Sequence, residues 1–293
     1  GTAWGLRRAW QGRSSAWGLP LAALAVALFV TLLLGRAHTA LTQPWAGLVD
    51  QLTVWEQPDD VVLLNRPEDT VAFAEGSHSR LWVVGLNEGE GELSPRAAWW
   101  LERLLEPGAR LWWIPNWLPP ERSAVERELM MHAYRALDLH EGDLRLALYV
   151  VPAAQMAEQP LGIPWAEGIT LESAAWPDAA APGDALPVRL RWQAAHPPQD
   201  DLVVYLHLLD AAGVRLAGHD AMPQLWLRPT STWHPGERIE DRHAFCLPPT
   251  LPPGTYTLRV GLYRADGGEQ LPTASGDEVV RLGTVQVLSS PAP

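Results

Sequence analysis

The sequence predicts three successive parts: one N-terminal transmembrane helix, a small α/β domain and an all-β immunoglobulin-like sandwich. An uncharged, mostly apolar stretch covers residues 16–35. Strand-like apolar runs alternate with helical patterns over residues 50–155. Short strands separated by turn signals fill residues 164–289. The chain has 293 residues, which is long enough for two such domains.

The apolar stretch 16–35 would span about 30 Å as a helix, which matches the core of a bilayer. Trp17 and Trp45 lie near its two ends, as interfacial anchors do. More arginines precede the stretch than follow it, so the positive-inside rule places residues 1–15 in the cytoplasm as a short loop. A cleaved signal peptide is the alternative, since basic residues also precede its apolar core. Because the chain begins with Gly1 rather than Met, we expect a C-terminal piece of a longer polytopic protein.

The composition excludes some classes of partner and site. The net charge is −12, all 22 basic residues are arginine, and nucleic acid is therefore not an expected partner. Cys246 is the only cysteine, which excludes an intrachain disulfide and a cysteine-rich zinc site. It lies in an apolar, strand-like run, which predicts a buried and unreactive thiol.

Four strand-like runs and two helices make up the predicted α/β domain. The runs are DVVLL (60–64), RLWVVGL (80–86), ARLWWIP (109–115) and LRLALYVV (144–151). Ser94 can cap a helix that begins at Pro95. A second helix is predicted over 120–139, with one buried stripe formed by Val125, Leu129, Ala133 and Leu137. This alternation indicates a small sheet with right-handed crossovers.

The glycine-rich segment GLNEGEGELS (85–94) follows one of these strands, where nucleotide-binding folds place a phosphate loop. It does not match G-x-G-x-x-G, and its three glutamates would repel a diphosphate. We therefore interpret it as a solvated loop rather than as a nucleotide site.

In the second domain the helical signal disappears. LPVRLRW (186–192) alternates between apolar and basic residues, whereas LVVYLHLLD (202–210) is apolar on both faces, as a central strand is. Turns such as Pro253-Gly254 and ADGG (265–268) separate about eight such strands. This spacing is typical of an immunoglobulin-like sandwich, a fold that assigns no activity by itself.

The segment TSTWHPGERIEDRH (230–243) contains the most reactive side chains of the domain. Ser231, His234 and Asp241 could be drawn as a hydrolase triad, but the G-x-S-x-G elbow is missing. Asp241 and His243 are two residues apart and share a face of a strand, and His207 and Asp220 could approach them to bind a metal ion. Hydrogen bonding around the Pro235-Gly236 turn is the alternative and better interpretation, so neither catalytic residues nor a metal ligand are assigned.

Several tryptophans could stack on sugar rings, and Trp226 and Trp233 are the candidates for glycan stacking. Trp233 could equally fill the core.

Three segments of the sandwich and three of the α/β domain carry a family resemblance. The first set is YLHLLDAAGVRLAGHD, PTSTWHPGERIEDRH and LPPGTYTLRVGLYRADGGEQLP, and the second is QPDDVVLL, RLWWIPNWLPPERSAVERELMMHAYRALDL and RLALYVVP. Together they resemble the C-terminal extracytoplasmic portion of bacterial membrane glycosyltransferases of the family 39 type, which are relatives of dolichyl-phosphate-mannose protein mannosyltransferases. The resemblance covers nearly the whole chain, without a catalytic fingerprint.

The resemblance implies transfer of a sugar from a polyprenyl-phosphate donor at the outer face of the cell membrane, with a divalent metal in the full-length enzyme as a further option. It places the catalytic carboxylates in the first extracytoplasmic loop, which this chain does not contain. No cofactor is therefore expected here, and the expected partners are membrane lipid and a glycan or lipid-linked sugar. A membrane-anchored module that binds glycans, or one that is purely structural, is the alternative.

Overall fold

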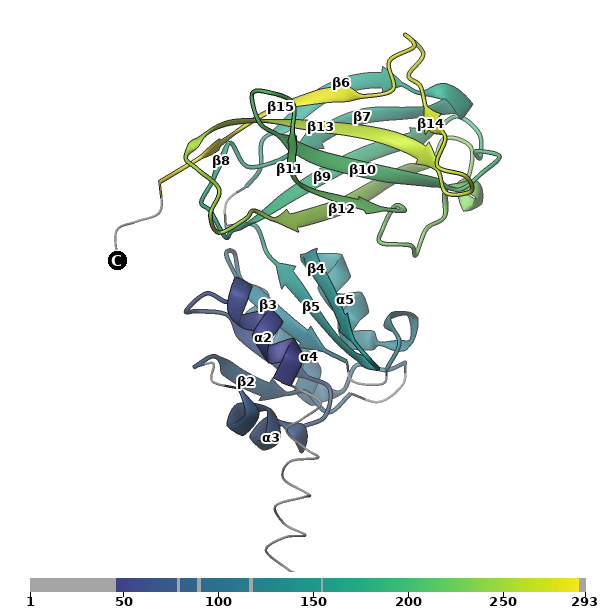
Figure 1. The fold of residues 1–293 in the computed structure, drawn as a ribbon. Coiled ribbons are helices and arrows are strands. Elements are labelled where there is room, and N and C mark those ends of the chain that lie inside the picture. The colour runs from purple at the N-terminus through teal and green to yellow at the C-terminus, as the bar shows by residue number, and fades with distance from the viewer. Residues whose placement is uncertain (1–45, 78–79, 89–90, 116–117, 154, 290–293) are drawn as a thin grey trace, which may run out of the picture.

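The computed structural model describes residues 46–77, 80–88, 91–115, 118–153 and 155–289. They form an α/β body and a β-sandwich stacked end to end (Figure 1). The predicted membrane helix at 16–35 lies outside these residues. None of the described helices is long and apolar enough to cross a membrane.

The α/β body has one five-stranded sheet in the order β2-β1-β3-β5-β4. β2, β1 and β3 are parallel, while β5 pairs antiparallel with both β3 and β4. Its elements are α2 (Ala46–Trp55), β1 (Val61–Leu64), α3 (Asp69–Gly76), β2 (Trp82–Gly85), α4 (Pro95–Leu104), β3 (Arg110–Ile114), the 3₁₀ turn η2 (Pro120–Arg122), α5 (Ala124–His132), β4 (Tyr134–Glu141) and β5 (Leu144–Val150).

The four predicted strands and the capped helix of this body occur. The Ser94 side chain accepts a hydrogen bond from the Ala97 N–H, and Pro95 is the first residue of α4. Two helices, α2 and α3, are additional to the prediction. α2 buries Leu48 and Leu52 in the same apolar cluster as Trp112 of the central strand β3.

The predicted second helix over 120–139 is wrong in its second half. α5 ends at His132, and the chain continues as β4, which pairs with β5 across a turn at Gly142. Val125, Leu129 and Ala133 are buried as expected, but Leu137 lies on the strand. The pairing with β5 outweighs the helical periodicity, because an edge of the sheet offers more buried contact than a continued exposed helix.

The remaining strands form two sheets that pack as a sandwich. The six-stranded sheet has the order β11-β10-β13-β15-β8 with β14 paired to β13, and the four-stranded sheet has the order β12-β9-β7-β6. The strands are β6 (Glu158–Pro164), β7 (Ile169–Ala175), β8 (Ala179–Ala180), β9 (Ala185–Ala194), β10 (Leu202–Leu209), β11 (Arg215–Ala221), β12 (Arg238–Cys246), β13 (Gly254–Arg264), β14 (Gln270–Leu271) and β15 (Val280–Val287), and the 3₁₀ turns are η3 (Ala166–Gly168) and η4 (Thr230–Thr232).

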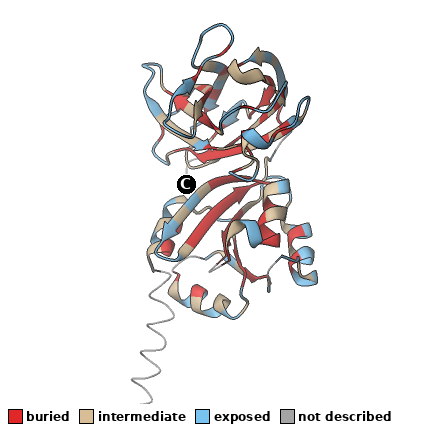
Figure 2. Ribbon diagram, turned by 90° about the vertical axis from the view of Figure 1, so that its right-hand side faces the viewer, coloured by how far each residue is buried: buried red, intermediate tan, exposed pale blue. Residues whose placement is uncertain are grey.

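The two bodies meet where β4 lies against β12. Small side chains of the four-stranded sheet, Ala175, Ala244 and Cys246, are buried in the same apolar cluster as the α/β sheet, and the half-buried Ala185 packs against it. Figure 2 shows buried strands on both sides of this seam. The Gln57 side chain also donates to Asp184 Oδ1 at 3.1 Å. The small residues allow the sheets to approach closely, so the two bodies share a core.

Candidate binding groove between the two domains

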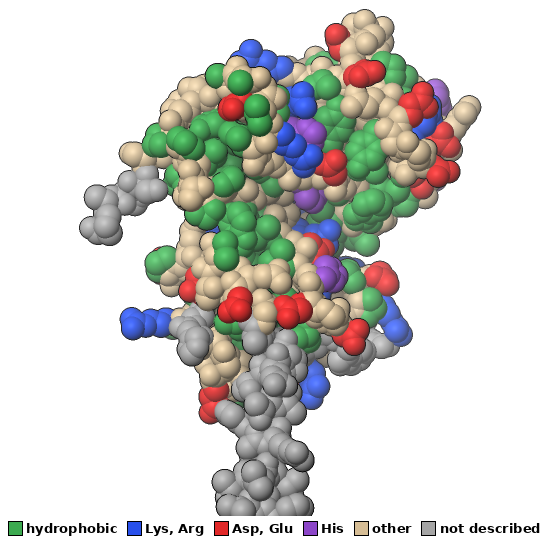
Figure 3. All heavy atoms as spheres, in the orientation of Figure 1, with side chains coloured by type: hydrophobic (Ala, Val, Ile, Leu, Met, Phe, Trp, Pro, Cys, Tyr) green, Lys and Arg blue, Asp and Glu red, His purple; other side chains and the backbone are tan. Residues whose placement is uncertain are grey.

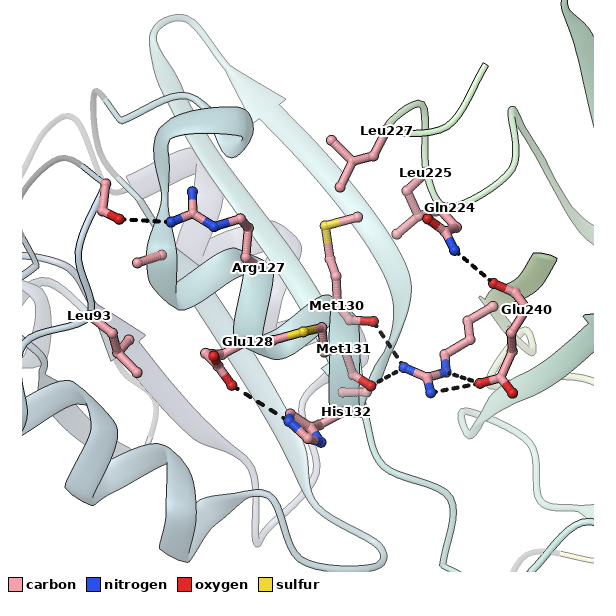
Figure 4. Close-up of a pocket in the computed structure, with 14 residues that line it drawn as sticks. Leu93, Arg127, Glu128, Met130, Met131, His132, Gln224, Leu225, Leu227 and Glu240 are labelled. Carbon is pink, nitrogen blue, oxygen red and sulfur yellow. Dashed lines mark hydrogen bonds and ion pairs between the residues drawn. The ribbon is translucent and has the colours of Figure 1, made fainter. Parts of the chain in front are cut away.

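A groove of about 750 Å³ opens at the seam beside α5. Its apolar lining comes from both bodies: Leu93, Met130 and Met131 from one, and Leu225 and Leu227 from the other. Figure 4 shows the α5 residues on one side and the 224–227 loop on the other. Met131 and Leu227 are 52% and 43% exposed. Such concave, mostly apolar surfaces with a few polar groups are typical of ligand sites.

The position of α5 is fixed at its N-terminus by two side chains. The Ser123 hydroxyl accepts a hydrogen bond from the Glu126 N–H, and the Glu88 carboxylate accepts from the Val125 N–H at 2.8 Å. Burial raises the pKa of Glu88, although these hydrogen bonds act in the opposite direction. Glu88 therefore occupies the anion position that a helix N-terminus offers.

A buried charge cluster holds the middle of α5. Glu126, which is fully buried, accepts two hydrogen bonds of 2.7 Å from the Arg145 guanidinium and one of 2.6 Å from the Tyr149 hydroxyl. Arg145 also donates to Asp138 at 2.6 Å. Burial alone would lower the pKa of Arg145, but its bonds to the two carboxylates raise it, so the guanidinium stays charged. The groove wall formed by Met130 and Met131 is thus rigidly supported.

The opposite wall has an unusual backbone. Gln224, Leu225 and Trp226 have φ angles of 52°, 55° and 77°, a left-handed run without glycine. Such a conformation costs roughly 1–2 kcal/mol per residue. It is held by Asp241, which accepts the Gln224 N–H at 2.8 Å, and by the Gln224 side chain, which donates to the Glu240 carbonyl. Strain of this kind gathers at binding sites, where the surrounding structure fixes it.

Charged groups line the rim of the groove. Arg242 donates to the carbonyls of Met130 and Met131 across the seam and pairs with Glu240 at 2.7 Å. Arg127 donates to the Gly91 carbonyl at 2.9 Å. Carbonyl groups hold both guanidiniums in place, and the Glu240 carboxylate also holds Arg242, so charged groups lie at fixed positions beside the apolar lining (Figure 4).

The structure divides the four metal candidates into two pairs. In the first, His243 Nε2 lies 2.7 Å from Asp241 Oδ2, and both side chains are fully buried. A third side chain, His219, contacts this pair, because its Nδ1 atom lies 3.2 Å from His243 Nδ1. Burial lowers the pKa of His219 to about 3, so its ring is neutral. A hydrogen-bond chain in which His219 donates to His243 and His243 donates to Asp241 satisfies all of these contacts.

The second pair is His207 and Asp220, whose side chains approach to 3.6 Å on the outer face of the six-stranded sheet. In the antiparallel register, Asp220 lies opposite Tyr205, whereas His219 lies opposite the core residue Leu206, so the two pairs occupy different faces. Throughout the described ranges there is no group of three or more His, Cys, Asp or Glu side chains arranged to hold a metal ion. The four candidates therefore do not converge, because adjacent strand residues point to opposite faces.

The two tryptophan candidates for glycan stacking differ in exposure. Trp233 is 1% exposed and donates its indole N–H to the Arg228 carbonyl, so it fills the core and cannot offer a ring face. Trp226 is 52% exposed in the left-handed loop and remains available to a ligand.

The residues drawn as a triad do not assemble either. The Ser231 hydroxyl donates to Asp201, and Asp241 bonds His243 instead of His234. Cys246 is buried as predicted, and burial raises the pKa of its thiol to about 12.

The sequence did not point to the groove. Its walls come from 91–93, α5, the 224–227 loop and β12, which are distant in the chain. The one local signal is Met130-Met131 at the end of a helix, since methionine suits adaptable binding surfaces.

No model of a protein family and no curated protein sequence matches the chain. Among solved structures, the C-terminal domain of wzt is similar at 13% identity and a TM-score of 0.32, with 47% of this chain and 80% of that chain covered. A Niemann-Pick type C2 protein from the Japanese carpenter ant has 7% identity and a TM-score of 0.28, with 46% and 100% covered. The CARDB domain of PF1109 from Pyrococcus furiosus has 10% identity and a TM-score of 0.25, with 39% and 84% covered.

Proposed function

We propose that this chain is the extracytoplasmic, non-catalytic C-terminal part of a membrane glycosyltransferase that transfers a sugar from a polyprenyl-phosphate donor, and that its groove contacts the acceptor. The observation that carries the proposal is the groove itself. Both bodies contribute residues to it, and fixed guanidinium groups lie beside its apolar lining. The family resemblance of the sequence supplies the reaction class.

The proposal includes the parts that lie beyond the described residues. A transmembrane helix at 16–35 anchors the chain in the cell membrane, with both domains on the extracytoplasmic side. The immunoglobulin-like type of the sandwich, the lipid-linked sugar and a divalent metal in the full-length enzyme belong to the same proposal. Because the catalytic groups of the proposed transferase lie elsewhere, the role of this region is to provide a surface that orients the acceptor. Correct orientation of the reactants can by itself lower the activation barrier substantially.

The first test is the coding sequence upstream of Gly1, which we expect to encode further hydrophobic spans and an acidic pair in the first outer loop.

The second test is mutagenesis of the groove in the full-length protein. Met131→Glu and Leu227→Glu should each raise the acceptor KM about tenfold, because a charge in the apolar lining costs on the order of 1.4 kcal/mol or more of binding free energy. Val54→Glu is the control, since Val54 is 58% exposed and lies outside the groove.

Unchanged acceptor kinetics in both groove variants would remove the groove from the proposal.

A membrane-anchored module that binds glycans is the second candidate function, and the half-exposed Trp226 favours it. A start codon directly before Gly1, together with glycan binding that Trp226→Ala abolishes, would support this candidate. Absence of glycan binding would leave a structural module.

A further inference from the structure

A row of polar side chains crosses the outer face of the six-stranded sheet. In register, His207 of β10 lies opposite Arg259 of β13, and Arg259 lies opposite Arg281 of β15. Cross-strand partners point to the same side of a sheet, so these residues form one surface. Figure 3 shows basic, acidic and histidine side chains close together among hydrophobic ones on the sandwich face where β10 and β11 lie in Figure 1.

The charges of this row are not balanced within the fold. Neither Arg259 nor Arg281 forms an ion pair with any residue that the structure describes. Arg259 NH2 lies 3.4 Å from His207 Nδ1, and its Nε atom is buried with no hydrogen-bond partner in the described part of the chain. Like charges on directly opposed strands destabilise a sheet, and an unpaired buried donor adds a further cost.

A third arginine lies beside the row but is neutralised. Arg215 pairs with Asp220 at 3.3 Å, and Asp220 lies 3.6 Å from His207 Nε2. The unbalanced positive charge therefore belongs to Arg259 and Arg281. The chain as a whole carries −12, so this local excess of positive charge opposes the composition.

Aromatic side chains share this outer face of the sheet with the arginines. A Cβ atom at Gly261 would lie 2.2 Å from the Tyr205 ring, so the glycine allows that ring to lie across the sheet. The Tyr205 ring stacks on the Tyr263 ring with a centroid distance of 6.1 Å, and it lies tilted by 35° against the His207 ring at 4.8 Å. Tyr263 is half-buried and adjoins solvent. A flat aromatic surface with neighbouring hydrogen-bond donors is suited to a sugar ring.

We propose that this outer sheet face, formed by His207, Arg259, Arg281 and Tyr263, binds an acidic oligosaccharide, with the oxyanion of one sugar between the two guanidiniums and a sugar ring on Tyr263. Guanidinium groups bind carboxylates and phosphates through paired N–H donors. This inference is independent of the groove and of the proposed function.

The test is calorimetric titration of the full chain in detergent with tetragalacturonate, a carboxylated oligosaccharide, against neutral maltotetraose and inorganic phosphate. We expect tetragalacturonate to bind, maltotetraose not to bind, and phosphate to bind at least tenfold more weakly. Arg259→Gln and Arg281→Gln should each weaken tetragalacturonate binding about tenfold. Arg238→Gln is the matched control, because Arg238 is exposed on β12 and pairs with Glu172.

The inference is overturned if tetragalacturonate does not bind, if maltotetraose or phosphate binds equally well, or if Arg238→Gln has the same effect as the two test variants. Arg281→Glu separates binding from folding. It should abolish tetragalacturonate binding and raise the thermal midpoint, because a cross-strand ion pair replaces a repulsive pair. A variant that keeps binding, or that loses both binding and stability, contradicts a binding role for the row.

Discussion

At the residue scale, the main result is that side chains of the types used in catalysis or metal binding form hydrogen bonds that stabilise the fold. Asp241 and His243 lie next to each other as their spacing predicted, but they complete a hydrogen-bond chain with His219 and hold the groove loop through Gln224. The indole N–H of Trp192 also reaches Asp241, at 3.3 Å. This chain joins β11 and β12, the edge strands of the two opposing sheets. A fully bonded polar cluster of this kind specifies how the sheets meet.

The neutral state of His219 gives a pH prediction. Its pKa falls from about 6.5 in the unfolded chain to about 3 in the folded one, chiefly because it is buried. The unfolded state therefore binds more protons below pH 6.5, and stability is fully present above that pH and lost as the pH falls towards 3. The loss should be on the order of 2–4 kcal/mol, measured as urea unfolding free energy at pH 7 and pH 4.

The variant His219→Gln keeps a hydrogen-bond donor for His243 but cannot take up a proton. We expect its stability to depend less on pH over this range than that of the wild type. His234→Gln, at an exposed turn position, should leave the pH dependence unchanged. An identical slope in His219→Gln and wild type would assign the acid sensitivity to other groups.

At the element scale, local signals predicted the strands and the helix N-terminus well, because a cap and a buried run are decided within a few residues. They did not predict the end of α5. The stripe from Val125 to Leu137 continues at helical spacing, yet residues after His132 pair with β5. Whether this segment becomes a strand depends on the sheet that it joins, so helical periodicity could not reveal that the strand would form.

The junction between β1, α3 and β2 depends on one glycine. A Cβ atom at Gly85 would lie 2.4 Å from the Pro67 Cα atom, which is backbone and cannot move aside easily. Gly85→Ala should therefore destabilise the protein by about 1–3 kcal/mol in urea unfolding. Gly254→Ala is the control, because the nearest atom, on the Tyr256 ring, is 3.7 Å from the added Cβ atom. Equal stability of the two variants would contradict the tight approach.

At the scale of the whole molecule, the two bodies are joined by a shared core instead of a flexible linker. Ala244 and Cys246 of β12 are buried in the cluster that contains Trp112 and Leu148 of the α/β sheet. Arg242 ties the same strand to the end of α5. The groove exists only because of this packing, since its walls come from both sides of the seam.

A shared core predicts joint unfolding. We expect one cooperative transition in scanning calorimetry of the wild-type chain. Ala244→Arg places a long charged side chain in the seam and should separate this transition into two, with a loss of about 3 kcal/mol or more for the coupled state. Val214→Arg, in an exposed turn, should keep a single transition. A single, unshifted transition in Ala244→Arg would show that the seam contributes little.

The sequence by itself determined the two-part plan, the strand runs, the Ser94 cap and the buried thiol of Cys246, because each follows from spacing and composition over a short window. The tertiary structure alone decided that Trp233 is core and Trp226 is exposed, that the metal candidates occupy opposite faces, and that Met130 meets Leu225 across a groove. It also placed Arg259 opposite Arg281. These relations depend on strand register and on how two distant surfaces pack, and neither is encoded in the spacing of neighbouring residues.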